Sequence, residues 1–103
     1  MAEFKSTPCP SYCPWGQIDH RAELAPGVWT VSTPSHGGIH VSDERRTAMP
    51  AIETFAGGNW FEEDCDWAWI CLVWPEIFPE ATHQIAKEVA LWNNPIALQR
   101  FPA

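Results

Sequence analysis

The stretch that decides the expected fold runs from Asn59 to Trp74 and has the sequence NWFEEDCDWAWICLVW. Asn59 and Glu62 have the spacing of a helix capping box, with Asn in place of the usual Ser or Thr. Acidic residues then crowd the first turn, where the helix dipole favours them. From Trp67 onward the stretch is apolar on every side, which predicts a buried central helix. A buried strand from Ile70 to Trp74 is the alternative, because periodicity does not separate the two over so short a run.

A second helix is predicted from Pro79 to Trp92, with proline in its first turn and Asn93-Asn94 before Pro95 at its end. One face of this helix is apolar and is expected to pack on the core, while His83, Lys87 and Glu88 face water. The apolar face consists of Ala81, Ile85, Val89 and Trp92.

The first half of the chain predicts strands. Residues 28–33 are β-branched or aromatic and follow the Pro26-Gly27 turn, and residues 39–41 could pair back on them. Residues 15–25 are expected to hold one further strand.

Short helical turns are predicted between the two halves of the chain. Ser42 is a suitable N-cap for a helix that ends at Ala48. Pro50 could open another turn from Ala51 to Phe55, which Gly57-Gly58 would end.

The predicted fold is therefore α+β, with a small antiparallel sheet in the N-terminal half packed against two main C-terminal helices. Residues 1–103 form a single domain. Its parts are an irregular segment 1–14, a β-rich region 15–41, a mostly helical region 42–92 and an extended tail 93–103.

The composition limits where in the cell the protein is expected. No run approaches the roughly 18 apolar residues that cross a bilayer, and the N-terminus lacks a signal-peptide layout. We therefore expect a cytoplasmic location, no membrane contact, and four reduced thiols.

The net charge of −7 is unevenly distributed. Residues 1–51 carry four basic against five acidic side chains, and residues 52–103 carry two against eight. No basic patch is visible, so direct binding of nucleic acid is not expected. A protein partner with a basic surface fits this charge better.

Two pairs of residues have the spacing of a structural zinc site, namely Cys9 with Cys13 and His36 with His40. His36 and His40 are separated by Gly37-Gly38, however, so they do not share a helical turn. The alternative is a loop with one buried thiol and a turn with solvated histidines, so we expect no cofactor, with zinc as the exception.

Thiol chemistry is a second possibility. Cys65 or Cys71 could pair with His36 or His83. Four carboxylates surround Cys65 and oppose a thiolate, and Cys71 lies in the most apolar stretch.

The acidic cluster Glu62, Glu63, Asp64 and Asp66 could bind a cation, supply paired carboxylates or dock a basic partner. It lacks the spacing of an EF-hand, and compensation of a helix dipole explains most of it.

The turn Ser35-His36-Gly37-Gly38 is the most loop-like candidate site, since two glycines let a ligand approach the backbone. A tight turn that needs positive φ is the alternative explanation of those glycines.

Several strings along the chain resemble an uncharacterised domain-of-unknown-function family of phages, plasmids and proteobacteria. They include Thr33-Pro34-Ser35-His36-Gly37-Gly38 and Trp60-Phe61-Glu62-Glu63-Asp64-Cys65. The resemblance implies that the His36 turn and the acidic stretch belong to one pattern and lie close in space. It also implies a mobile-element accessory protein, and by analogy an inhibitor of a host defence complex of the anti-CRISPR or anti-restriction type.

The first functional hypothesis is a non-enzymatic acidic binding protein, for which the oligomeric state stays open. Its expected surface comprises Glu62, Glu63, Asp64, Asp66, His36, Gly37, Gly38 and Trp60. The second is a small enzyme or metal-dependent catalyst centred on His36 with Glu62, Glu63 or Cys65. The third is a structural module stapled by zinc on the two cysteine and histidine pairs.

Overall fold

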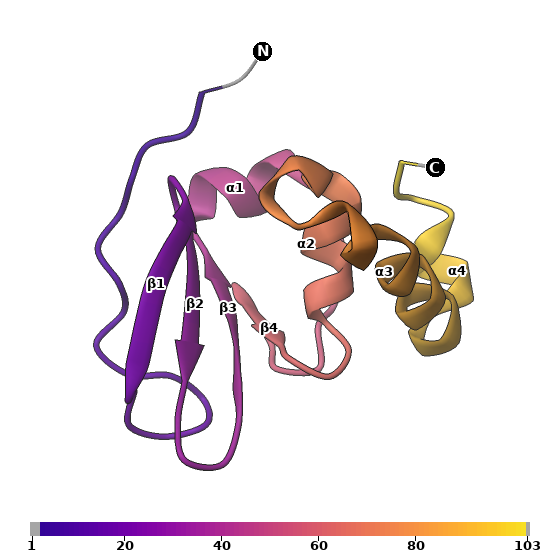
Figure 1. The fold of residues 1–103 in the computed structure, drawn as a ribbon. Helices are drawn as coiled ribbons and strands as arrows, with labels where there is room; N and C mark the ends of the chain where they lie inside the picture. Colours follow the sequence, from indigo (N-terminus) through magenta and orange to yellow (C-terminus); the bar gives the residue numbers. More distant parts are fainter. Residues whose placement is uncertain (1–2, 103) are drawn as a thin grey trace.

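The computed structural model describes residues 3–102 and shows a four-stranded antiparallel sheet with the helices gathered on one side of it (Figure 1). The strand order β1-β2-β3-β4 follows the chain, so the sheet is a meander. The predicted α+β class is confirmed. The elements are β1 (His20–Ala25), β2 (Val28–Ser32), β3 (Gly37–Val41), α1 (Asp43–Ala48), β4 (Trp60–Glu62), α2 (Trp67–Val73), a 3₁₀ turn η1 (Pro75–Ile77), α3 (Glu80–Asn93) and α4 (Pro95–Leu98).

The two hairpins of the sheet follow from local sequence. Pro26 and Gly27 connect β1 to β2, and Gly27 has φ +80°, which glycine adopts without steric cost. A Cβ added to Gly27 would also lie 2.7 Å from the Oγ of Ser42. Ser42 itself caps α1 as predicted, because its Oγ accepts a hydrogen bond from the Arg45 amide at 3.2 Å.

One face of the sheet packs against the helices. Val28 pairs with Val41 and Ile39 pairs with Phe61 across the strands, so these side chains project to the same face. They join the buried residues of α2, led by Trp69 and Ile70, in one core. The buried helix predicted for this stretch is therefore confirmed, and the strand alternative is wrong.

The N-terminal segment covers the other face of the sheet and has no helix or strand over residues 3–12, as expected for 1–14. The Trp29 Nε1–H donates to the Thr7 carbonyl at 2.7 Å, and Trp15 packs edge-on against Trp60 at 5.7 Å between ring centroids. The first two residues of the irregular segment, like Ala103 in the tail, lie outside the described residues.

The predicted start of a helix at Asn59 is wrong. Residues Trp60–Glu62 form β4, which pairs with β3, and the helix begins only at Trp67. Capping-box spacing is a local signal, whereas the free edge of β3 offers backbone hydrogen bonds and a buried position for Phe61. Glu62 therefore ends β4, Glu63 and Asp64 lie in the turn that follows, and Asp66 is the N-cap residue of α2. The first turn of α2 itself contains no acidic residue, so the predicted crowding of acids there is wrong.

Three further expectations differ from the structure. No helix forms between residues 49 and 59, so the turn predicted from Ala51 to Phe55 is absent and the region 42–92 is less helical than expected. The tail is not extended, because Asn94 caps α4 by accepting from the Ala97 amide at 3.0 Å and Phe101 is buried against Trp69.

The buried side of α3 also differs from the prediction. Ala86 and Ala90 are fully buried, whereas Ile85 is 52% exposed and Trp92 is 84% exposed. Small side chains let α3 approach α2 closely, and the larger apolar residues are left toward solvent. None of the helices formed by residues 3–102 is long and apolar enough to cross a membrane.

Candidate functional site

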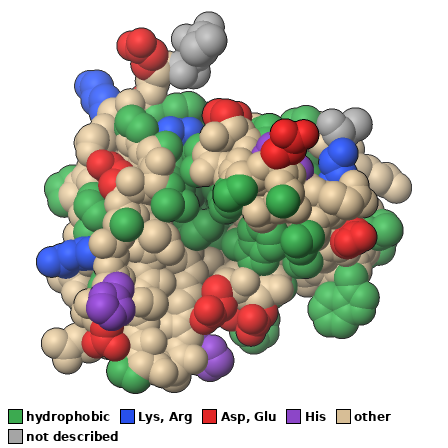
Figure 2. All heavy atoms as spheres, viewed as in Figure 1, with side chains coloured by type: hydrophobic (Ala, Val, Ile, Leu, Met, Phe, Trp, Pro, Cys, Tyr) green, Lys and Arg blue, Asp and Glu red, His purple; other side chains and the backbone are tan. Residues whose placement is uncertain are grey.

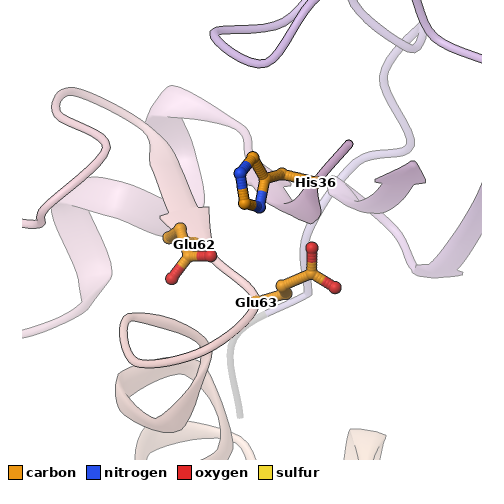
Figure 3. Close-up of side chains that lie close together, drawn as sticks. All are labelled: His36, Glu62 and Glu63. Carbon is orange, nitrogen blue, oxygen red and sulfur yellow. The ribbon is translucent and has the colours of Figure 1, made fainter. Parts of the chain in front are cut away.

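The His36 turn and the acidic turn meet at one end of the sheet. Ligand-type atoms of His36, Glu62 and Glu63 all lie within 4.8 Å of one another. Figure 3 shows the imidazole of His36 directed between the two carboxylates. The adjacency that the family resemblance implies is therefore present, and β3–β4 pairing produces it, because Gly38 is the partner of Glu62 in the sheet.

Thr33 shapes the turn that presents His36. Its Oγ1 donates to the His36 carbonyl at 2.7 Å and accepts from the amides of Ser35 and His36 at 3.3 and 3.1 Å. The Thr33 amide also donates to the His36 carbonyl at 2.8 Å. This side chain holds the backbone of the turn and leaves the His36 ring exposed.

Gly37 and Gly38 are required for packing, and neither has positive φ. A Cβ on Gly37 would lie 2.7 Å from the Val31 carbonyl oxygen. A Cβ on Gly38 would lie 2.4 Å from the Phe61 carbonyl oxygen and 2.4 Å from the ring of Trp15. The left-handed-turn explanation is therefore wrong. Both glycines also line the groove described below, so the approach of a ligand to their backbone stays a prediction.

Glu63 is tied to the His36 turn through two backbone contacts. Its amide donates to the Gly37 carbonyl at 3.1 Å, and its carboxylate Oε2 accepts from the Gly37 amide. The side chain stays exposed. Glu63 thus has a defined position, and no residue in the range 3–102 donates a hydrogen bond to its Oε1.

Glu62 differs from Glu63 because it is only 6% exposed. Its Oε2 accepts from the Asp64 amide at 2.9 Å and from the Cys65 thiol at 3.5 Å. Oε1 makes no hydrogen bond to any residue in the range 3–102. Oε1 is not fully enclosed by protein, so it stays open to solvent or to a ligand.

Asp66 has a structural role. It is 1% exposed, and its carboxylate accepts from the backbone amides of Phe55, Ala56 and Glu62 at 2.9, 3.0 and 3.1 Å. These bonds fix the irregular segment before β4 to the start of α2. Asp66 is thus unavailable as a binding residue, while Asp64 is exposed.

The thiols are poorly suited to nucleophilic chemistry. Burial, the charge of Asp66 and the hydrogen bond to Glu62 raise the pKa of Cys65 to about 12. Burial also raises the pKa of Cys71, which belongs to the core. The predicted partner His83 hydrogen-bonds through Nε2 to the carbonyls of Pro75 and Phe78 at 2.8 and 3.1 Å. A thiolate needs a lowered pKa, so this geometry disfavours Cys65 as a catalytic nucleophile.

The four residues proposed as a zinc staple do not converge. Among residues 3–102 the one group of three or more potential ligands is the cluster of His36 with the two glutamates. The Cys13 thiol donates to the Gly16 carbonyl at 3.3 Å, and the His40 ring packs at a tilt against Trp60, with ring centroids 4.6 Å apart. Trp60 is half-buried between His40 and Trp15, which limits its reach toward a partner.

A groove opens beside this cluster, between the sheet and α3. Its volume is about 440 Å³, and Glu63 stands on its rim. Figure 2 shows hydrophobic side chains gathered at the junction of sheet and helices, with acidic side chains at the edge of this apolar area. The sequence did not indicate this groove, because its walls come from separate elements. Its lining includes Leu24, Thr30, Ile39, Trp67, Phe78 and Thr82.

The fold and this site define a small α+β domain in which a covered four-stranded meander presents a histidine and two glutamates next to an apolar groove. Residues 8–101 match the family described as domain of unknown function (DUF7007), and the chain belongs to this family. The match includes both the His36 turn and the acidic turn. Neither a curated protein nor a solved structure matches the chain.

Proposed function

We propose that this protein is a non-enzymatic binding protein that docks an acidic and aromatic surface onto a basic surface of a protein partner. The observation that carries the proposal is the charge of the exposed surface. Eleven carboxylate side chains are exposed among residues 3–102, against four cationic side chains, which are Lys5, Arg21, Lys87 and Arg100.

The remaining arginines are engaged inside the protein. Arg45 is buried, lies over the ring of Phe4 at 3.9 Å and donates through Nε to the Pro26 carbonyl at 2.9 Å. Arg46 lies over the ring of Phe61 at 5.1 Å and donates to the Gly58 carbonyl at 3.2 Å. Neither guanidinium is therefore presented to a partner, and the net charge of −7 attracts a cationic partner and repels nucleic acid.

The proposed docking surface is the groove with its acidic rim, which we call the acidic groove. Trp67 and Phe78 supply aromatic walls, with ring centroids 6.1 Å apart, and Glu63 supplies charge in the lining. The exposed Asp64 follows Glu63 in the chain and adds a second charge. An apolar depression with charge at the rim suits a partner segment that inserts an apolar side chain flanked by Lys or Arg.

The setting we propose is a phage or other mobile element acting in the cytoplasm of a bacterial host. The partner class is then a basic, nucleic-acid-binding defence complex of the CRISPR or restriction type, inhibited by occupation of its nucleic-acid surface. This choice of partner class rests on the occurrence in phages, plasmids and proteobacteria that the family resemblance implies, and on charge complementarity.

The test is a pull-down from host lysate with the tagged chain, washed at low and at high salt. Salt shortens the screening length from about 10 Å at 0.1 M to about 3 Å at 1 M, so a charge-driven complex should be lost at high salt. Asp64→Lys should weaken retention about tenfold. Glu88→Lys, the same charge change on the exposed side of α3, is the matched control. Equal losses in both variants, or no effect of salt, would refute docking at the acidic groove.

A metal-dependent catalyst at His36 is a second candidate, favoured by the convergence of His36, Glu62 and Glu63 within 4.8 Å. The version that uses Cys65 has no such support. Hydrolysis of model esters and phosphodiesters by purified protein, with and without added Zn²⁺ or Mn²⁺, tests it. Turnover that disappears in His36→Gln would establish catalysis, and no turnover with either metal would exclude these reactions.

A further inference from the structure

We propose that His36, Glu62 and Glu63 bind one divalent transition-metal ion, with Zn²⁺ the best fit. We call these three residues the histidine–glutamate cluster. The inference goes beyond the proposed docking function and does not rest on it, because metal binding by the purified chain requires no protein partner.

The ligand types fit such an ion. Imidazole nitrogen favours zinc, iron and copper, while carboxylate oxygen is accepted by zinc and by harder cations. Zinc sites that bind an exchangeable water commonly have three protein ligands drawn from His and Glu or Asp. One histidine with two glutamates matches that number and leaves a fourth position for solvent.

The distances fit with small side-chain movements. Zinc bonds of about 2.0–2.2 Å place two ligand atoms at most about 4.4 Å apart, on opposite sides of the ion. The three ligand atoms already lie within 4.8 Å of one another. His36 and Glu63 are exposed and can each rotate to close the remaining gap, whereas Glu62 is held in place.

Glu62 supplies evidence independent of the clustering. Its side chain is 94% buried, as its 6% exposure implies, yet within residues 3–102 only Oε2 receives hydrogen bonds, from the Asp64 amide and the Cys65 thiol. Oε1 is not fully enclosed by protein, and the Glu62 carboxylate lies on the side of the imidazole and of the second carboxylate (Figure 3). A cation at this point would compensate both the buried charge and the repulsion between two neighbouring carboxylates.

The surroundings orient the ligands as metal sites require. The Gly37 amide donates to Glu63 Oε2, and the Cys65 thiol and Asp64 amide donate to Glu62 Oε2. Within residues 3–102, each glutamate thus has one oxygen that accepts hydrogen bonds and one that accepts none. Such outer contacts fix ligand geometry and commonly change metal affinity by 10- to 100-fold when removed. His36 immediately precedes β3, Glu62 ends β4 and Glu63 follows it, so the pairing of β3 with β4 holds His36 near both glutamates without the metal.

The experiment is calorimetric titration of Zn²⁺ into the full chain after treatment with a chelator. We expect one ion per chain, with affinity at least tenfold weaker in His36→Gln and in Glu63→Gln. Glu63→Gln retains an oxygen for the Gly37 amide, so it tests the ligand and spares the turn. The matched controls are His20→Gln and Glu88→Gln, both exposed and outside the cluster, which should bind like the parent chain.

Co²⁺ absorption distinguishes this site from one built on cysteine, because thiolate ligands add an intense near-ultraviolet charge-transfer band that imidazole and carboxylate ligands do not. We expect no such band. Zinc binding that survives His36→Gln and Glu63→Gln but is lost in Cys9→Ser would overturn the proposal. Absence of any Zn²⁺ binding by the parent chain would overturn it equally, and would leave the salt-dependent pull-down unaffected.

Discussion

Asp66 should be the acidic residue on which the fold depends most. The carboxylate is 1% exposed and accepts three backbone hydrogen bonds, from Phe55, Ala56 and Glu62. Asp66→Ala removes the acceptor and leaves these amides without a partner. The amides cannot all reach water, since the bond from Glu62 is buried.

The loss of unfolding free energy in Asp66→Ala can be worked out from these hydrogen bonds. Each hydrogen bond to a charged group contributes about 1.5–3 kcal/mol, so three give roughly 4–9 kcal/mol before the desolvation cost of the carboxylate is subtracted. That cost is several kcal/mol for a buried ion. We therefore expect Asp66→Ala to lower the free energy of unfolding by about 3–5 kcal/mol, a large part of the 5–15 kcal/mol typical of a domain.

Urea unfolding followed by tryptophan fluorescence measures this loss, because the chain contains seven Trp. Asp64→Ala is the control, since Asp64 is exposed and should change stability by less than about 0.5 kcal/mol. A loss below about 1 kcal/mol for Asp66→Ala would refute the argument that this carboxylate organises the segment before β4.

Three further predictions concern the sheet and the titrating groups. Gly38→Ala should lower the free energy of unfolding by about 3 kcal/mol in urea unfolding, because its Cβ would lie 2.4 Å from the Phe61 carbonyl oxygen. Cys65 should be alkylated very slowly at pH 8, since a pKa of about 12 leaves roughly one thiol in ten thousand ionised. Mass spectrometry of iodoacetamide-treated native protein should show its labelling rate rising about tenfold per pH unit from pH 7 to 10. Burial lowers the pKa of His40, so the unfolded chain binds a proton more readily, and stability should fall as pH drops below about 6.5. Unfolding curves at pH 7.5 and 5.5 should show a smaller pH effect in His40→Gln than in the parent chain.

Each of these predictions has a contrary result. Wild-type stability in Gly38→Ala would mean that Trp15 and β4 yield to an added methyl group. Rapid alkylation of Cys65 at pH 8 would show that its thiolate is stabilised and would revive a nucleophilic role. An unchanged pH dependence in His40→Gln would assign the titration to another group.

Much of the secondary structure could be predicted from local sequence. The Pro26-Gly27 turn, the capping by Ser42 and the all-round apolar run from Trp67 are confirmed, because each acts through neighbouring residues. α3 was predicted within a residue of its observed limits. The buried face of α3 could not be predicted, since it depends on how closely Ala86 and Ala90 approach α2.

The candidate site needed tertiary structure. Local spacing at Asn59 favours a helix, yet Trp60–Glu62 is a strand, because the edge of β3 supplies backbone partners 20 or more residues away in the chain. That one pairing buries Glu62, turns Glu63 toward Gly37 and brings both to His36.

The sequence by itself determined the net charge of −7, the glycines of the turn and the types of side chain available as ligands. Only the tertiary structure decided which acids are available, because burial commits Asp66 to three backbone amides and leaves Glu63 and Asp64 exposed. Residue type sets the chemistry of a group, while non-local strand pairing and burial set its partners.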